Sequence, residues 1–446
     1  MRYYPEDANT VWGGNSACKH EFEIEERKHK LFRERLEETS PLQAKNRGSL
    51  LATKSMVKSG FCKKCGAWFG QLGNEPTLEL FIEHLLMVTK ELKRVLKPTG
   101  TFWLNIGDSY IGSMQGFGQK KPSTGIQNVM EMTQYPGHYG APPQAKYKKI
   151  PKKCMSLQNF RLVLRMIDEQ GFILRNTIIW KKLGHLPSSV HDRLTNAYEP
   201  VFFFVKSNKT RLWYDKFKKE WYDKKPEQYW VNLVTGETTN EKPEGEDRIF
   251  WTKAILGYHY FFNLDEIRLP IKGESFLRYI SQAKLPISKR DANDPKVHFH
   301  KLTKLFKMQK KGIDLETLKR AGIDSPPTHR MHPHFANLFG KNPGDVWELP
   351  TAKGESTLHF AQFPEELVEK CIIAGSPKGG VVLDPFAGSG TTLKVARELG
   401  RSCIGIEIVG EYISEIKRRV GWGMSLPKSV TWTFIDLMSE KNEKKV

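Results

Sequence analysis

The first group of residues that could take part in chemistry is a glycine turn in the segment DPFAGSGTT, residues 384–392. Gly388 and Gly390 are two positions apart, which lets the backbone approach a ligand closely, and the helix expected after them would point free amide groups at that ligand. Glu407 ends the next expected strand, about 20 residues after the turn, where an acid can hold the hydroxyls of a ribose. This spacing predicts a nucleotide site, and by itself it would also fit a dinucleotide dehydrogenase.

Two short-spaced pairs of metal-binding residue types lie near the N-terminus: Cys18 with His20, and Cys62 with Cys65. Together they supply four ligands of the types that a structural zinc ion prefers. A CxxC pair could instead be a redox pair, but no thioredoxin-like strand and helix follow it, and unliganded surface residues are a third interpretation. We therefore predict a zinc site, which would hold together a long N-terminal insertion that lacks a core of its own.

Three further candidates lie at the end of an expected strand at residues 101–106, namely Asn105, Asp108 and Tyr110. Ligands of open α/β sheets sit beyond the carboxyl ends of the strands, so these side chains are candidates for a binding pocket. A capped turn that closes the strand is an equally good interpretation of each of them.

The elements that must position these groups alternate between helix and strand along much of the chain. Helices are expected at residues 77–96, 157–170 and 393–399, and strands at residues 101–106, 172–180, 197–206, 381–383 and 403–406. This alternation predicts a doubly wound α/β sheet. The charged stretch EIEERKHKLFRERLEE is typical of a solvated helix. The segment VTWTFI, at residues 430–435, is typical of one more strand.

Three segments interrupt this pattern. Residues 112–151 are rich in Gly, Pro, Gln and Lys, and suggest a lid, a strand-binding loop or disorder. Residues 211–270 are rich in Trp and Tyr, and we favour an accessory β-hairpin that turns at Gly236 over a WW module. Residues 272–342 are basic and fit a region that contacts DNA phosphates and bases.

The composition favours a polyanionic partner. Among 446 residues, 70 Lys and Arg outnumber 50 Asp and Glu, which gives a net charge of +20 and suits nucleic acid above all. No apolar run approaches the roughly 20 residues that span a bilayer, and the N-terminus does not resemble a signal or transit peptide. We expect a cytosolic protein whose six cysteines are thiols or metal ligands, not disulfides.

Several long stretches, in their order along the chain, resemble the β-class of DNA amino-methyltransferases, and most of all the cytosine-N4 branch and its phage-type relatives. The stretches are GQLGNEPTLELFIEHLLMVTKELKRVLKPTGTFWLNIGDSY, RNTIIWKKLGHLPSSVHDRLTNAYEPVFFFVKS, GKNPGDVWELP, HFAQFPEELVEKCI, and DPFAGSGTT with IGIE. The resemblance implies a Rossmann-like methyltransferase sheet in circularly permuted order, with the cofactor half at the C-terminal end.

The resemblance also implies S-adenosylmethionine as the cofactor, double-stranded DNA as the partner and a prokaryotic or phage cytoplasm as the setting. It places the cofactor against one set of residues near the glycine turn. These are Phe363, Pro364, Asp384, Pro385, Phe386, Gly388, Ser389, Gly390, Thr391, Thr392 and Glu407.

The family's catalytic loop has no counterpart in this sequence. In the family an exocyclic base nitrogen attacks the methyl group directly, after the base has left the duplex and met a Ser-Pro-Pro-Tyr or Asp-Pro-Pro-Tyr loop. Nothing like that loop precedes the zinc segment, and Ser-Pro-Pro at residues 325–327 fits an ordinary turn. The family's segment also carries the strand that lies beside residues 381–383. The catalytic residues therefore stay unassigned.

Three explanations follow from this: a start codon assigned too far downstream, an upstream partner polypeptide that completes the sheet, or an inactive remnant. The expected activity is methylation of cytosine N4 in DNA. Adenine-N6 methylation, a catalytically incomplete DNA-binding subunit, and methylation of RNA or a small molecule are the alternatives.

The chain divides into four expected regions. Residues 1–70 form the segment with the zinc knuckle, and residues 71–210 form the catalytic half of the methyltransferase domain. Residues 211–345 hold the accessory hairpin and the target-recognition region, and residues 346–446 form the cofactor half.

Overall fold

The computed structural model describes most of the expected elements. The described residues are 8–32, 52–111, 150–151, 153–184, 191–209, 211–232, 236–244, 251–269, 342–352 and 362–421. Nearly all of the loop expected at 112–151 and of the basic segment expected at 272–342, with its Ser-Pro-Pro turn, lies outside the described residues, as does the strand expected at 430–435. No helix in the described part of the chain is long and apolar enough to cross a membrane.

The N-terminal region forms a four-stranded antiparallel sheet in the order β1-β4-β3-β2. Its strands are β1 (Thr10–Trp12), β2 (Phe22–Phe32), β3 (Ala52–Cys62) and β4 (Trp68–Gly70). The prediction of a solvated helix in the charged stretch is wrong. Strand β2 forms there instead and pairs with β3 along its whole length, from Phe22 opposite Cys62 to Phe32 opposite Ala52. Pairing with a distant segment overrides the helix propensity of Glu, Lys and Arg.

The central sheet contains four strands in the order β14-β6-β7-β5. They are β5 (Thr101–Asn105), β6 (Ile173–Leu183), β7 (Tyr198–Val205) and β14 (Val346–Pro350). β14 runs parallel to β6, whereas β7 runs antiparallel to both β5 and β6. The α/β class is confirmed, but the sheet is mixed, since the described residues between β6 and β7 form no crossover helix.

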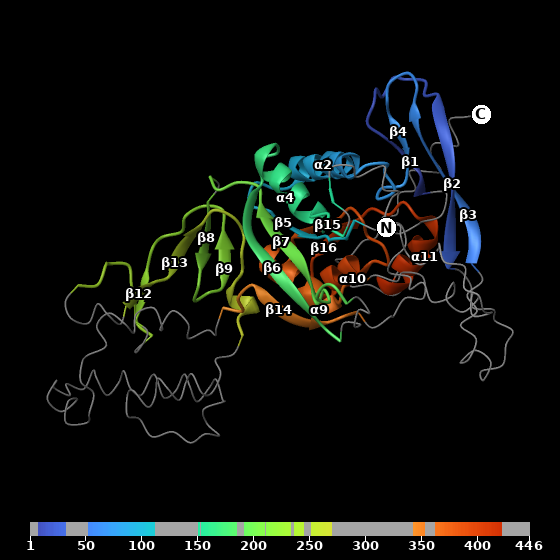
Figure 1. Ribbon diagram of the computed structural model, residues 1–446. Coiled ribbons are helices and arrows are strands. Elements are labelled where there is room, and N and C mark those ends of the chain that lie inside the picture. Colours follow the sequence, from blue (N-terminus) through green and yellow to red (C-terminus); the bar gives the residue numbers. More distant parts are fainter. Residues whose placement is uncertain are drawn as a thin grey trace.

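Helices cover both faces of this sheet (Figure 1). They are α2 (Leu78–Val95), α4 (Gln158–Asp168) and α9 (Glu365–Gly375). Phe202 and Phe204 of β7 pack with α2 and α4, whereas Val201, Phe203 and Val205 face the side that α9 covers. All five are nearly inaccessible to solvent. Side chains of a strand alternate between its faces, so one apolar run serves both layers.

A second, two-stranded parallel sheet carries the glycine turn. Its elements are β15 (Val381–Asp384), α10 (Thr391–Glu398), β16 (Ser402–Gly405) and α11 (Gly410–Arg419). Helix α9 joins the two sheets: Leu367 belongs to the core of the central sheet, while Val368 and Ile372 pack with Val395 and Ala396 of α10. The expected strand, turn, helix and strand are therefore confirmed at residues 381–405.

The aromatic insertion forms two small antiparallel sheets, β13-β8-β9 and β11-β10-β12. Their strands are β8 (Leu212–Asp215), β9 (Glu220–Tyr222), β10 (Trp230–Asn232), β11 (Thr238–Thr239), β12 (Trp251–Lys253) and β13 (Ile255–Tyr258), and the 3-10 helix η5 (Asp265–Ile267) follows. The hairpin expected at Gly236 is confirmed, because β10 and β11 pair around it and Gly236 has a φ of 76°. Glycine adopts this left-handed conformation more readily than residues with a side chain.

Candidate functional site

The glycine turn lies where β15 ends and α10 begins. The amide of Phe386 donates to Asp384 Oδ1 over 3.0 Å, which folds the chain back directly after the strand. Gly388 and Gly390 have φ angles of 54° and 80°, in the left-handed region that favours glycine. Gly390 is also the N-cap of α10 and carries no side chain that could cap the helix, so the first amides of α10 face the turn. Such a helix end attracts anionic or strongly polar groups.

Glu407 reaches this turn from the end of β16. Its Oε2 accepts a 2.7 Å hydrogen bond from the amide of Gly388, and its Oε1 accepts one of 2.8 Å from the amide of Val409. Burial raises the pKa of the Glu407 carboxyl above its ordinary value, although these amides favour the ionised form, and the charge of Asp384 adds to the rise. The structure thus brings Glu407 and the turn together as expected. A carboxylate has about four lone-pair sites, so Glu407 can also accept from a ligand hydroxyl.

The hydroxyls of the turn face into the protein. Arg419, at the end of α11, donates to Ser389 Oγ and to Thr391 Oγ1 over 2.9 Å each, and Ser389 and Thr391 are both buried. These contacts fix the turn, and cofactor binding by Ser389 and Thr391 stays a prediction. Their backbone amides remain at the start of α10.

An acidic residue at the start of α9 completes this network. Glu365 accepts from Arg419 Nη2 over 2.8 Å and from Lys394 Nζ over 2.7 Å. The sequence reasoning missed both Glu365 and Arg419. Glu365 directly follows the Phe363-Pro364 motif and could have been added to it, whereas Arg419 has no sequence signal.

The remaining residues predicted for the cofactor are arranged in different ways. Pro364 is the N-cap of α9, and Phe363 packs into the cores on both sides of that helix, so these two position α9. Phe386 is exposed beside the turn, with 54% of its surface accessible, and it is free of the apolar cores in the described residues. An aromatic ring in this place can pack against a flat ligand.

Asp108 lies in the turn after β5, and its carboxylate caps the start of helix α4. Its Oδ1 accepts from Ser156 Oγ over 2.6 Å and from the amide of Gln158 over 3.3 Å, while Oδ2 accepts from the amide of Leu157. Asn105 donates to the Pro200 carbonyl. The capped-turn interpretation fits Asp108, whereas the hydrogen bond of Asn105 crosses to the neighbouring strand β7.

Tyr110 is different, because it meets other polar side chains. Its hydroxyl lies 3.3 Å from Asn196 Oδ1, and the guanidinium of Arg193 stands 4.1 Å from the centre of its ring. Tyr110 thus contacts Asn196 and Arg193 in the described part of the chain, and a pocket at the end of β5 stays a prediction.

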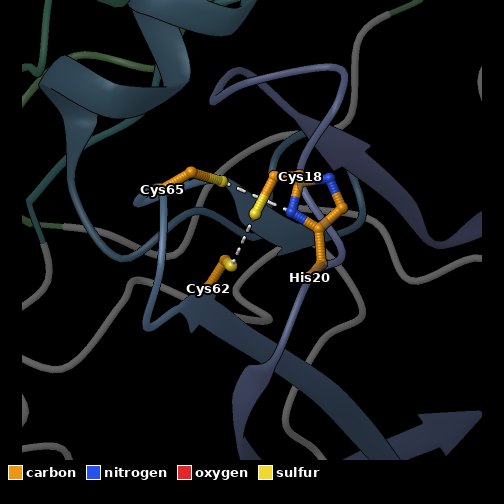
Figure 2. A group of neighbouring side chains, drawn as sticks. All are labelled: Cys18, His20, Cys62 and Cys65. Carbon is orange, nitrogen blue, oxygen red and sulfur yellow. Dashed lines mark hydrogen bonds between the residues drawn. The ribbon is translucent and has the colours of Figure 1, made fainter.

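The four predicted metal ligands come together where β3 ends and β2 begins (Figure 2). The ligand atoms of Cys18, His20, Cys62 and Cys65 all lie within 4.8 Å of one another. Burial opposes ionisation of the Cys62 thiol, but amide groups of the Cys65 turn and the ring of His20 outweigh it and lower the pKa of Cys62 to about 6. Thiolates are the form in which cysteine binds metals.

The family of this chain follows from comparison with known proteins. Residues 39–418 match the family N6_N4_Mtase, described as DNA methylase. The chain belongs to this DNA methylase family. It is 30% identical to the type II methyltransferase M.SfiI of Streptomyces fimbriatus over 77% of this chain and 80% of that protein. It is 27% identical to the type II methyltransferase M.SmaI of Serratia marcescens over 79% of this chain and 77% of that protein.

Among solved structures, the methylase is similar to PvuII DNA methyltransferase (cytosine-N4-specific), with a TM-score of 0.38 and 15% sequence identity. The match covers 79% of this chain and 73% of that one. The family confirms the resemblance drawn from the sequence and, with it, S-adenosylmethionine as the cofactor. The choice between N4 and N6 amines stays open at the level of the family.

Proposed function

We propose that this methylase transfers a methyl group from S-adenosylmethionine to the N4 amine of cytosine in double-stranded DNA. In this proposal the cofactor lies at the glycine turn between β15 and α10, in the C-terminal half of a circularly permuted domain. The observation that carries it is the hydrogen bond from Gly388 to Glu407, because it places an acid and a glycine turn side by side at the end of a strand. In nucleotide-binding α/β folds this pairing holds a ribose.

The side chains around the turn have separate roles in this proposal. Glu407 accepts the ribose hydroxyls, the amides of Ser389 and Thr391 face the polar part of the cofactor, and the exposed ring of Phe386 packs on a flat group. The amide of Gly390 instead donates to the Ala387 carbonyl over 2.8 Å and closes the turn. Arg419 fixes the turn by its hydrogen bond to Ser389, and Glu365 holds Arg419 in place. Rate enhancement would then come from positioning and charge stabilisation, since no covalent intermediate with the protein is needed.

Double-stranded DNA as the substrate is supported by the family and by the net charge of +20. Cytosine N4 is supported by the resemblance of the sequence to the cytosine-N4 branch, and adenine N6 is the alternative. A labelled methyl group from S-adenosylmethionine, followed by digestion of the duplex and mass spectrometry of the nucleosides, separates the two. We expect N4-methylcytosine, and label on adenine alone would refute the choice of base.

A second candidate function is a DNA-binding subunit whose sheet is completed by a partner polypeptide. Among the described residues β5 pairs only with β7, and β15 only with β16, so each has one unpaired edge. Every residue of β5 is only half-buried, whereas its neighbour β7 is buried from Pro200 to Val205. Strands with helices on both faces are normally buried along their whole length.

Both strands with an open edge begin near the C-terminal end of the same helix, α9. Thr101, the first residue of β5, donates to the carbonyl of Gly375 at the end of α9, and β15 starts soon after that carbonyl, at Val381. Val381 is 56% exposed. A strand parallel to both could pair with each edge and cover Val381.

Two measurements separate this second function from the first. Calorimetry with S-adenosylmethionine, together with the methylation assay, would give cofactor binding without transfer if the chain acts only as a subunit. Hydrogen exchange would then find, within Thr101–Asn105 and Val381–Asp384 of the isolated chain, that the amides at the open edges are unprotected, while the amides that point to β7 and β16 are protected. Protection of both strands together with methyl transfer would refute the need for a partner.

A further inference from the structure

The N-terminal sheet ends in a cluster of three sulfur atoms and one ring nitrogen, contributed by Cys18, His20, Cys62 and Cys65. We propose that this cluster binds a structural zinc ion, which fixes the N-terminal sheet against helix α2. The proposal does not depend on the methyl-transfer reaction, since its test is the metal content and folding of the protein.

The distances between the ligand atoms fit a tetrahedral metal. Cys18 Sγ and Cys62 Sγ are 4.0 Å apart, and Cys65 Sγ lies 3.3 Å from His20 Nδ1. Zinc–sulfur bonds of about 2.3 Å and zinc–nitrogen bonds of about 2.0 Å in a tetrahedron give S···S near ~3.8 Å and S···N near ~3.5 Å. A disulfide would bring two sulfurs to about 2.05 Å, which is far shorter than the distance between Cys18 and Cys62.

The ligand set also indicates a closed, structural site. Three thiolates and one imidazole fill all four positions that zinc takes in such sites, which leaves none for a substrate. A catalytic zinc would keep one position open for water. The metal would therefore contribute to folding and not to chemistry.

The backbone around Cys62 and Cys65 already has the shape of a ligand turn. The amide of Gly66 donates to the Cys62 carbonyl over 2.9 Å, and the amide of Cys62 donates to the Ala67 carbonyl over 2.7 Å. Gly66 has a φ of 71°, which a residue with a side chain would adopt only with strain. The chain therefore reverses tightly after β3, and both thiols point to the same side (Figure 2).

The cluster stands where the long β2–β3 hairpin ends. Phe22 pairs with Cys62, and one residue further on the amide of Lys63 donates to the Glu21 carbonyl over 2.9 Å. The ladder between β2 and β3 ends here, and Cys18 and His20 lie in the segment before β2. A metal bound to both strand ends would close the hairpin at the point where backbone pairing stops.

The same sheet is attached to the rest of the protein through aromatic rings. Trp12 of β1 and Trp68 of β4 each stack with His84 of α2, with ring centres 5.0 Å and 5.3 Å from that of His84. His84 Nδ1 lies 2.9 Å from Glu75 Oε1, and Trp68, His84 and Glu75 are all buried. Because Trp68 follows Cys65 by one short turn, the metal would fix the strand that holds α2.

The first test is the metal content of the full-length protein. Elemental analysis of protein expressed with zinc should find one equivalent of zinc in the wild type. Cys18→Ser and Cys62→Ser should lose it, whereas His20→Cys should keep it, because four thiolates also suit zinc. Cys154→Ser is the matched control, since Cys154 is exposed and lies outside the cluster.

Two results would overturn the zinc assignment without any need for a variant to fold. One is wild-type protein that holds no zinc above the level in the buffer, or that holds iron in its place. The other is an intact mass two hydrogens short, with a disulfide mapped to two of the four ligands. Substitution by cobalt adds a direct readout, because three thiolates and a ring nitrogen in a tetrahedron give strong visible absorption bands.

The second test asks whether the metal fixes the sheet on α2. Removal of zinc by a chelator should raise hydrogen exchange at the amides of β3, β4 and the start of α2, and zinc added back should restore protection. Exchange at β15 and β16 should not change, since these strands lie in a separate sheet. Equal exchange in β4 and α2 before and after removal would refute the structural role.

Discussion

The Oε2 atom of Glu407 accepts a 2.7 Å hydrogen bond from the amide of Gly388, across 19 positions of sequence. This contact joins the end of β16 to the glycine turn after β15. It leaves the carboxylate beside the helix end at which the proposed cofactor lies. The predictions below begin from this contact and the residues that support it.

Glu407→Ala should lower the affinity for S-adenosylmethionine about 10- to 100-fold, because hydrogen bonds to a charged group are worth about 1.5–3 kcal/mol. Isothermal calorimetry on the variant measures this directly. Glu398→Ala is a suitable control, since Glu398 is exposed on α10 and lies outside the turn. An unchanged dissociation constant for Glu407→Ala would remove Glu407 from the cofactor site.

The affinity should also depend on pH through Glu407. Its pKa is raised by burial, so the carboxyl of the folded protein takes up a proton at a pH at which the unfolded chain is still ionised. As the pH falls through this raised pKa, the ionised acceptor for the ribose hydroxyls is lost and the affinity should fall. The effect of Glu407 on the stability of the folded protein has the opposite pH dependence. Ionisation of this buried acid costs free energy, so the folded protein loses stability as the pH rises through the raised pKa. Calorimetry across this window checks the first effect. A pH profile that is identical in Glu407→Gln and the wild type would assign the titration to another group.

Arg419→Met should destabilise the C-terminal sheet by about 2–4 kcal/mol. The substitution leaves the buried hydroxyls of Ser389 and Thr391 without their donor and removes one cation from Glu365. Thermal unfolding should report a lower midpoint, and cofactor affinity should fall with it. Arg418→Met, at the exposed neighbour that pairs with Glu415, should change stability by less than about 1 kcal/mol. Equal effects of the two substitutions would contradict a special role of Arg419.

Asp108→Ala should lower stability by about 1–2 kcal/mol, which is the usual cost of losing a helix cap. Cofactor affinity should stay the same, because the carboxylate of Asp108 is occupied by the start of α4. Asp168→Ala is the matched control, since Asp168 is an exposed acid at the opposite end of the same helix. Loss of methyl transfer at unchanged stability would instead make Asp108 a pocket residue.

Local sequence predicted the elements whose causes are local. Thr77 caps α2 by accepting from the amide of Leu80, as expected from a Thr before an apolar helical pattern. The strand, glycine turn and helix at 381–398 also follow from a short stretch, because a buried apolar run and two glycines restrict the backbone there. The spacing of Cys62 and Cys65 is local in the same way.

Long-range pairing decided what the sequence pattern could not. The charged segment that begins at Phe22 has helix propensity but forms a strand, because the partner that satisfies its backbone lies at the other end of a long hairpin. The direction of β7 likewise depends on which edge it joins. Neither choice is visible in the alternation of apolar residues.

The sequence by itself determined the family, the cofactor and the position of the glycine turn, since these follow from motifs and from their order along the chain. Only the tertiary structure decided that Ser389 and Thr391 face Arg419, that Asp108 caps a helix, and that β5 and β15 each have an open edge among the described residues. The physical reason is that a motif specifies the local backbone. The partner of each polar side chain depends on packing between segments that are far apart in sequence.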